Sequence, residues 1–510
     1  DLVSAGLVAR EGEQEPAYAF RPALMRDAAY GSMLRSRRIE LHRRVAETLE
    51  LRFPALAESQ PDIVAHHFTE AGDVAAAVPR WAKAAERAIA NAAPASAIRH
   101  FTTALDLLMR RPESPERDER EMALRIRLNM PLTVTTGFAS SETETNLGRI
   151  EELFKARAPS EAVLQLLWSR AMSALVRADL VAARSTAQRL SYAAERAVAS
   201  EVWRMPARIL GYVAMLEGEL DAAQGHFDRM LDGYAPEGFD PILTGHPFDV
   251  LAASHAQRAI VMALKGWPEA VARDEARALE RARRLDSPAT AFQVLVHLCL
   301  ARFELGDHEG VRPLLRKLRA VVDENEVRPL YANLWEAWEE AREGALEDGV
   351  SRMRAVQEEG TQYPLWMPSA LMLRAGLLMD AGRHADALET LAICQADIQR
   401  LRHTYLLPEH ARRRALCLAA TGGPEAQVVA LLEEAVATAA GQGSRRFELS
   451  ARRDLARRRL AAEDAEAAAE ALRPGLGVEP ACHALPEYGE IRALLESLPA
   501  TAQRLAASGE

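Results

Sequence analysis

Residues of the types that carry catalysis or bind metals form no recognised motif in this 510-residue chain. No GxxxxGK[ST] stretch is present to cradle nucleotide phosphates, and HExxH, GxSxG and paired-cysteine zinc spacings are also missing. His66 and His67 are adjacent, but neighbouring side chains on a helix point about 100° apart. We expect one ring to be buried and one to lie at the surface, rather than a shared metal. The chain itself is therefore predicted to be no enzyme, with no catalytic residue, no metal site and no cofactor.

The cysteines and the overall charge indicate the cellular compartment and the kinds of partner to expect. The four cysteines lie far apart, form no CxxC pair and are expected to be reduced, mostly buried thiols of a cytoplasmic protein: Cys299, Cys394, Cys417 and Cys482. No export signal is visible, and the longest apolar run, at 291–301, is about half the length that a bilayer requires. A formal net charge of −10 disfavours non-specific nucleic-acid binding. We expect neither a membrane nor a nucleic acid as partner of this segment.

Two arginine-rich stretches could meet an acidic partner or nucleotide phosphates. Residues 35–44 contain five arginines against Glu40, and residues 445–459 contain seven against Glu448 and Asp454. Each stretch also has the pattern of a solvated helix face with i,i+4 ion pairs, which is the favoured interpretation.

One aromatic cluster stands out in a chain with only 5% aromatic residues. Tyr331, Trp335 and Trp338 follow one another at i, i+4 and i+7, and Tyr363 and Trp366 open the next repeat. These five rings are the candidate site for a protein partner or a small-molecule effector in the groove of a superhelix. Core packing between repeats is the competing interpretation, and it is slightly favoured.

A recurring phrase indicates which elements would position these side chains. A helix ends in Leu or Ala, Gly or Ala with a charged residue follows, and a small residue comes four or five positions later. Examples are EGELDAA (217–223), LGDHEGV (305–311) and AGRHADAL (381–388). The glycine or its equivalent falls at 178, 218, 266, 306, 344, 382 and 422, with gaps of 40, 48, 40, 38, 38 and 40 residues. Such a period is typical of tetratricopeptide-like helix pairs. Glycine tolerates the left-handed cap, and the small residue one turn later lets the helices approach.

The predicted fold is therefore all-α, a tetratricopeptide-like α-solenoid superhelix with a small winged-helix remnant at its N-terminus. The expected domains are the end of a winged helix at 1–50, first helical repeats at 51–110, a linker at 111–120 and a repeat array at 121–505. Residues 7–10 and 18–20 are expected to be two short strands around the turn EGEQEP. Residues 232–249 are rich in glycine and proline and are predicted to be a long loop, either a binding loop or a plain insertion.

A family resemblance rests on FRPALMRDAAYGSMLRSRRIELHRRVAETLE (20–50), on PDIVAHHFTEAGDVAAAVPRW (61–81) and on the repeats that follow. These stretches resemble bacterial AAA/STAND-type signalling ATPases, which are commonly fused to class III adenylate or guanylate cyclase domains. The resemblance implies that an ATPase domain lies upstream of Asp1 and that this segment is its regulatory arm. The arm would bind a protein or small-molecule signal and bias the state of the ATPase in cis. The alternative is the inducer-sensing arm of a STAND-type transcription activator.

Overall fold

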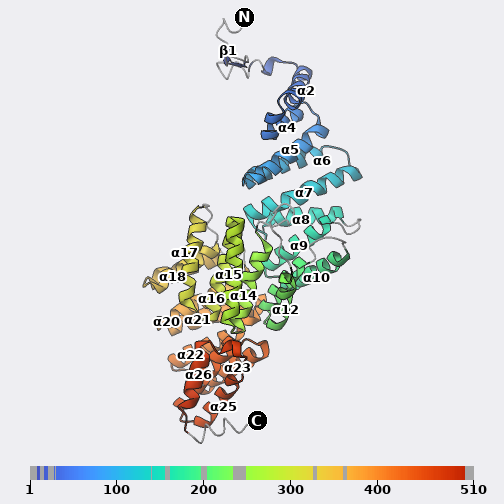
Figure 1. Ribbon diagram of the computed structural model, residues 1–510. Helices are drawn as coiled ribbons and strands as arrows, with labels where there is room; N and C mark the ends of the chain where they lie inside the picture. Colours follow the sequence, from blue (N-terminus) through green and yellow to red (C-terminus); the bar gives the residue numbers. More distant parts are fainter. Residues whose placement is uncertain are drawn as a thin grey trace. The chain divides into compact units, whose positions relative to one another are not determined.

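The computed structural model describes residues 8–11, 17–20, 28, 30–138, 140–154, 161–196, 204–233, 248–324, 330–359 and 364–499. Helices make up nearly all of this part, as antiparallel pairs joined by short turns (Figure 1). The fold is the predicted all-α, tetratricopeptide-like solenoid. The chain divides into two compact units, residues 1–135 with 152–155 and residues 136–151 with 156–510, and each is described by itself.

The first unit starts with a two-stranded hairpin. Strands β1 (Val8–Glu11) and β2 (Ala17–Phe20) pair antiparallel, with Val8 opposite Phe20, so the predicted strands around EGEQEP are confirmed. That they end a winged helix stays a prediction. The helices that follow are α2 (Arg35–Arg52), α3 (Pro54–Ser59), α4 (Pro61–Glu70), α5 (Val74–Ala90), α6 (Pro94–Met109) and α7 (Pro115–Thr136).

The linker predicted at 111–120 is shorter than expected. Helix α7 begins at Pro115, so only the residues around 110–114 connect α6 to α7. Proline has the backbone angle of a first helical residue, and Glu116 and Asp118 in the first turn complement the positive end of the helix dipole. Pro115 and the charged residues after it, which contributed to the linker prediction, therefore form the first turn of α7.

The second unit opens with α8 (Ser141–Phe154) and continues as consecutive helix pairs. The pairs are α9 (Glu161–Val176) with α10 (Leu180–Arg196), α11 (Met205–Leu216) with α12 (Leu220–Leu231), α14 (Val250–Leu264) with α15 (Pro268–Leu285), α16 (Pro288–Leu305) with α17 (His308–Glu324), α18 (Leu330–Arg342) with α19 (Leu346–Glu359), α20 (Met367–Asp380) with α21 (His384–Leu401), α22 (Leu407–Ala420) with α23 (Glu425–Gln442), and α24 (Arg445–Ala461) with α25 (Ala465–Leu476). Short 3-10 turns, η3 (Pro364–Trp366), η4 (Thr404–Leu406) and η5 (Pro480–Cys482), precede α20, α22 and the last helix, α26 (Pro486–Glu496).

The turns within these pairs confirm the predicted repeat. A residue with a left-handed backbone stands at every position that the period marked, with φ from 57° at Ala178 to 114° at Gly344. Glu463, with φ of 62°, occupies the same place between α24 and α25. The sequence pattern missed that turn because its left-handed residue is a glutamate, neither glycine nor alanine. The predicted loop at 232–249 lies mostly outside the described residues.

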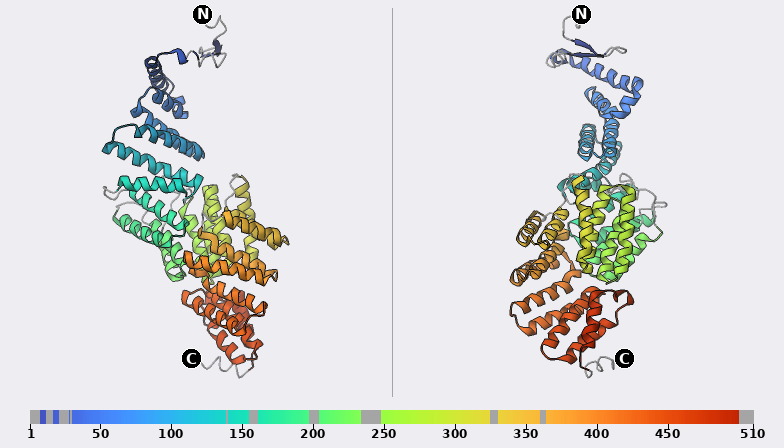
Figure 2. Two further views of the ribbon diagram at one scale, coloured as in Figure 1. Left: turned by 180° about the vertical axis from the view of Figure 1, so that it is seen from behind. Right: turned by 60° about the vertical axis from the view of Figure 1, so that its left-hand side comes forward.

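Three of the turns touch segments that follow much later in the chain. Arg402 Nε donates to Glu217 Oε1 at 2.8 Å, and Ser444 Oγ donates to the carbonyl of Leu264 at 3.3 Å. We call this contact the seam: residues 217–218, 264–266 and 305–306 on one side, and 402, 442–446 and 482–485 on the other. Figure 2 shows the C-terminal helices, in red, at the turn ends of α14 and α15, in green.

The glycines at the seam have a second role besides the turn itself. A Cβ added to Gly218 would lie 2.7 Å from Gln442 Nε2, and one added to Gly306 would lie 2.6 Å from Arg446 Nη2. Gly382, in an equivalent turn away from the seam, has no such neighbour within 4 Å. Glycine at the seam therefore permits both the left-handed backbone and the close approach of the returning chain.

Candidate functional site: a cavity beside the seam

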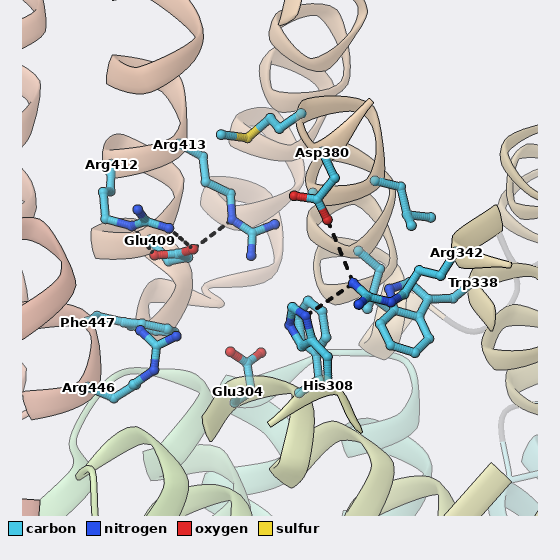
Figure 3. Close-up of a pocket in the computed structure, with 15 residues that line it drawn as sticks. Glu304, His308, Trp338, Arg342, Asp380, Glu409, Arg412, Arg413, Arg446 and Phe447 are labelled. Atoms are coloured by element: carbon cyan, nitrogen blue, oxygen red, sulfur yellow. Dashed lines mark hydrogen bonds and ion pairs between the residues drawn. The ribbon is translucent and has the colours of Figure 1, made fainter. Parts of the chain in front are cut away.

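A cavity of about 160 Å³ lies in the second unit, next to the seam (Figure 3). First helices of successive pairs supply most of its wall, because these helices face the inside of the superhelix. We call it the arginine cavity. It is lined by Phe303, Glu304, His308, Trp338, Arg342, Leu373, Gly376, Leu377, Met379, Asp380, Glu409, Arg412, Arg413, Arg446 and Phe447.

Two adjacent arginines of α22 share one buried carboxylate. Arg412 donates to both oxygens of Glu409 at 2.7 and 2.8 Å, and Arg413 Nε donates to Glu409 Oε1 at 2.7 Å. Burial alone would raise the pKa of Glu409, but Arg412 and Arg413 outweigh it and hold that pKa well below its usual range. Arg413 also donates through Nη1 to the carbonyl of Met372 at 2.6 Å. Its Nη2 has no hydrogen-bond partner among the described residues.

Arg446 connects the arginine cavity to the seam. Its Nε donates to the carbonyl of Leu305 at 3.1 Å, which joins the start of α24 to the end of α16. Its other nitrogens contact Ser450 Oγ at 2.5 Å and Glu487 Oε1 at 3.1 Å. Burial lowers the pKa of Arg446, while Glu487 and Glu409 oppose that change. A side chain in the wall of the cavity is thus part of the contact that closes the superhelix.

The opposite wall combines a cation with aromatic rings. The guanidinium of Arg342 lies 5.1 Å from the centre of the Trp338 ring, within cation–π range. Its Nη1 is 3.3 Å from His308 Nδ1 and 3.7 Å from Asp380 Oδ2. His308 stacks on Phe303 with ring centres 5.1 Å apart. Burial, followed by the nearby Arg342, lowers the pKa of His308 to about 4, so its ring is neutral near pH 7.

Glu304 is the unusual member of the lining. Its side chain is buried, with 5% of the residue exposed, and no hydrogen bond or ion pair joins its carboxyl group to any residue in the described part of the chain. Burial raises the pKa of Glu304 to about 7, although Arg413 acts in the opposite direction. Figure 3 shows this carboxyl group at the base of the cavity, between Arg446 and His308.

The lining of the arginine cavity is rich in cationic groups. Four arginines stand against three carboxyl groups, one of them half protonated near pH 7. The lining contains no serine, threonine or cysteine that could act as a nucleophile. Guanidinium groups in a partly dehydrated site are suited to hold carboxylate or phosphate oxygens.

The structure places one ring of the predicted aromatic cluster, Trp338, in the wall of this cavity. Trp335, Trp338 and Trp366 are buried, with 1%, 2% and 7% exposed, and Tyr331 is half-buried. Trp335 and Trp338 meet edge to face at 5.8 Å between ring centres, and Tyr331 lies 5.1 Å from Trp366. Tyr363 lies outside the described residues, and partner binding by these rings stays a prediction.

Sequence reasoning did not bring Glu304, Arg342 and Arg413 together. They come from three different helix pairs, and only the winding of the superhelix makes them neighbours. One signal was present: Glu304 is the one carboxylate among the buried residues of α16, most of which are apolar. A charge at such a position is costly unless it serves a purpose.

The other candidates from the sequence lie in ordinary environments. Most arginines of 445–459 pair with carboxylates of their own or neighbouring helices, such as Arg459 with Glu433 at 2.6 Å, while Arg446 enters the cavity. In the first unit His66 is exposed, and the half-buried His67 has its Nδ1 2.8 Å from Nδ1 of His42. All four cysteines are buried and unpaired by disulfides.

Neither a metal site nor a membrane helix is found where the structure is described. No three His, Cys, Asp or Glu side chains in the described ranges gather in a way that could hold a metal ion. None of the helices there combines the length and the apolar character needed to cross a bilayer.

Comparisons with known proteins give distant similarities. No protein-family model matches the chain. An uncharacterised protein of Rhizobium meliloti (strain 1021) is 24% identical over 454 residues, which are 86% of this chain and 43% of the relative. The chain therefore spans less than half of that relative's length.

Among solved structures the similarities are to helical-repeat proteins. A Rap protein complexed with competence and sporulation factor aligns with 80% of this chain and 97% of its own, at 14% identity and a TM-score of 0.41. Yeast Tom70 aligns over 93% and 96%, at 13% identity and 0.35. A STAND protein with a tetratricopeptide-repeat sensor from Pyrococcus horikoshii aligns over 79% and 67%, at 11% identity and 0.34. With TM-scores below 0.5, the fold assignment stands on the helix pairs of this chain itself.

Proposed function

We propose that this chain is the non-catalytic, signal-receiving arm of a larger signalling ATPase. The arm binds a protein or small-molecule signal inside its superhelix and biases the state of an ATPase domain on the same polypeptide. The observation that carries the proposal is the position of the arginine cavity beside the seam, with Arg446 belonging to both. A ligand in the cavity therefore has a direct route to the contact that closes the superhelix.

The mechanism is a shift between two arrangements of the seam. A ligand changes such an equilibrium only by binding one arrangement better than the other. The closed seam places α24 against the end of α16 and so completes the wall of the cavity. An open seam separates Arg446 from the rest of the lining. Signal binding then favours the closed arrangement, and the curvature of the solenoid changes with it.

Exposed apolar side chains in the first unit support the proposal that another domain packs there. Leu51 and Phe53 at the end of α2 and Leu56 in α3 lie within six residues of one another and have 81%, 45% and 39% of their surface exposed. Large side chains left exposed in this way commonly mark a contact surface. The Rhizobium meliloti relative is more than twice as long as the aligned segment, which leaves room for such a domain. We propose that an upstream ATPase domain covers this surface.

The test uses the complete gene product that contains this segment. Gly266→Ala opens the seam, whereas Gly382→Ala alters an equivalent turn where a Cβ meets no atom within 4 Å. We expect Gly266→Ala to change the rate of ATP hydrolysis by the complete protein and Gly382→Ala to leave it unchanged. The 510-residue chain alone should hydrolyse no ATP and form no cyclic nucleotide. A complete protein without ATPase activity, or with the same rate in both variants, would refute the proposal.

The size of the arginine cavity also suits the alternative, an inducer-sensing arm of a STAND-type transcription activator. The two proposals differ in the output. A transcription activator should bind duplex DNA specifically, with an affinity that falls steeply as salt is raised. Gel-shift titrations of the complete protein against its own promoter region distinguish the two outputs.

A further inference from the structure

We infer that the arginine cavity binds a small organic anion, whose carboxylate or phosphate group is held by Arg413 and Arg342. This inference deepens the proposed function, because it names the chemical class of the signal. It stands on unused hydrogen-bond donors, on an unpaired carboxyl group and on an aromatic wall.

The first observation concerns donors that lack acceptors. Arg413 Nε and Nη1 are engaged by Glu409 and Met372, but Nη2 has no partner in the described residues. Arg342 uses Nη1 toward His308 and Asp380, and its Nε and Nη2 are likewise unmatched within the described part of the chain. Figure 3 shows the two guanidinium groups facing the same space from α22 and α18. Neither side chain is fully buried, so these donors are open to the cavity and available to the oxygens of an anion.

The second observation is the carboxyl group of Glu304, which faces the same space without a partner. The charged and titratable groups around it (Figure 3) are Arg413 and Glu409 of α22, Arg446 of α24, Tyr405 of η4 and the neutral His308 of α17. With its pKa raised to about 7, the carboxyl group is readily protonated, and in that form it donates a hydrogen bond to an anion. In its ionised form it would repel the same anion. Ligand binding should therefore be coupled to protonation of Glu304.

The third observation is the apolar surface opposite these donors. Trp338, Phe303 and the neutral ring of His308 form one wall, and Leu373 and Leu377 continue it. Rings of this kind bind apolar or aromatic groups. An inorganic ion would leave this wall uncovered. The cavity therefore fits an anion with a small apolar or aromatic body.

Binding to the purified 510-residue chain tests the inference directly. Isothermal titration calorimetry with benzoate and with phenyl phosphate, each against acetate, separates the head group from the ring. We expect a dissociation constant of about 1 mM or lower for at least one aromatic anion and weaker binding of acetate. The stronger of the two aromatic anions identifies the head group as a carboxylate or a phosphate.

Two variants and a matched control locate the site. Arg413→Gln and Arg342→Gln should each weaken binding about tenfold or more, since each removes a charged donor. Arg459→Gln removes an arginine that pairs with Glu433 on the surface and should have no effect. Circular dichroism identifies a variant that fails to fold. Because the side chain of Arg342 is more exposed than that of Arg413, at 26% against 12%, the Arg342 variant preserves the test. Equal binding by all variants would overturn the inference, as would no binding of either aromatic anion.

The pH dependence provides an independent readout. Benzoate stays ionised between pH 6 and 8, so a change in its affinity reports on the protein. With the pKa of Glu304 at about 7, affinity should fall about tenfold from pH 6 to pH 8. Glu304→Gln keeps a donor that does not titrate, and its affinity should be flat over this range. A flat profile in the unaltered chain would contradict the role of Glu304. These measurements need no ATPase domain, so their failure is distinguishable from failure of the proposed function.

Discussion

Replacing Gly266 with alanine disturbs the seam where a buried side chain and a backbone atom of the returning chain lie against the turn. Gly266 has φ of 76°, and the returning chain lies directly against it. A Cβ at this position would be 2.9 Å from Leu485 Cδ1 and 3.4 Å from both the Arg446 backbone nitrogen and Cys482 Sγ. Leu485 is buried, so its side chain has little room to move away. The substitution should therefore push the two sides of the seam apart.

The magnitude follows from comparing Gly266 with Gly382. Both glycines have a left-handed backbone, with φ of 76° and 73°, and alanine in that conformation costs about 1–2 kcal/mol. Only Gly266→Ala adds the strain of overpacking, which is about 1–3 kcal/mol. We expect a loss of about 2–5 kcal/mol for Gly266→Ala and about 1–2 kcal/mol for Gly382→Ala in urea-induced unfolding.

The thiol of Cys482 reports on the seam itself. Its Sγ donates to the carbonyl of Lys265 at 3.4 Å, and the residue is fully buried. Burial, together with the nearby Glu479, raises the pKa of the thiol to about 12, so it should react slowly with a disulfide reagent. Opening the seam exposes this thiol to solvent. Labelling of Cys482, followed by peptide mass spectrometry with the buried Cys299 as internal reference, should be about fivefold faster or more in Gly266→Ala.

Gly382→Ala is the control because its new Cβ meets no atom within 4 Å. Labelling of Cys482 should keep its original rate in this variant. Equal acceleration in both variants would show that the thiol responds to general loss of stability and not to the seam. A thiol that reacts in the unaltered chain as fast as in urea would show that the seam does not form, and the reasoning would be refuted.

Three further substitutions have defined expectations. Burial raises the pKa of Glu304 to about 7, so ionising this group costs stability in the folded chain. As pH rises from about 4.5 to 7, the chain should lose about 3 kcal/mol of unfolding free energy relative to Glu304→Gln. A difference in unfolding free energy between the two chains that stays constant with pH in urea would contradict this. Arg208 is 2% exposed, has no carboxylate partner in the described residues and contacts Met172 Sδ at 3.5 Å. Because burying an unpaired charge costs free energy, Arg208→Met should keep or raise the melting temperature. A marked fall in the melting temperature would contradict this. Trp335→Ala removes a side chain that is 1% exposed and should cost about 3–5 kcal/mol in chemical denaturation, whereas a negligible loss would exclude a core role.

The repeat turns could be predicted from sequence because their conformation selects a residue type. Left-handed φ favours glycine, so Gly218, Gly306 and their equivalents mark the period directly. Glu463 adopts the same conformation without that mark and was missed. The boundary at Pro115 was also missed, since proline and charge occur in linkers and in first helical turns alike.

The arginine cavity could not be predicted in the same way. Its key side chains, Glu304, Arg342 and Arg413, occupy unrelated positions in three helix pairs. Whether they meet depends on the small rotation between each pair and the next, summed over several repeats. That rotation is determined by side-chain packing between pairs and leaves no period in the sequence. The aromatic cluster, in contrast, is local, so the sequence predicts that its members lie together, while their burial depends on the packing between pairs.

The seam also constrains how this array can change in length. In an open solenoid each repeat touches only its neighbours, so stability is a sum of local contributions and a pair can be gained or lost with little effect elsewhere. Here hydrogen bonds join residues 141 to 217 positions apart, as between Leu305 and Arg446 and between Lys265 and Cys482. Inserting or deleting one pair between them would bring a different turn beneath α24. The repeats within the seam should therefore unfold as one cooperative block, and duplication of a single repeat, tolerated in an open array, should be excluded inside it.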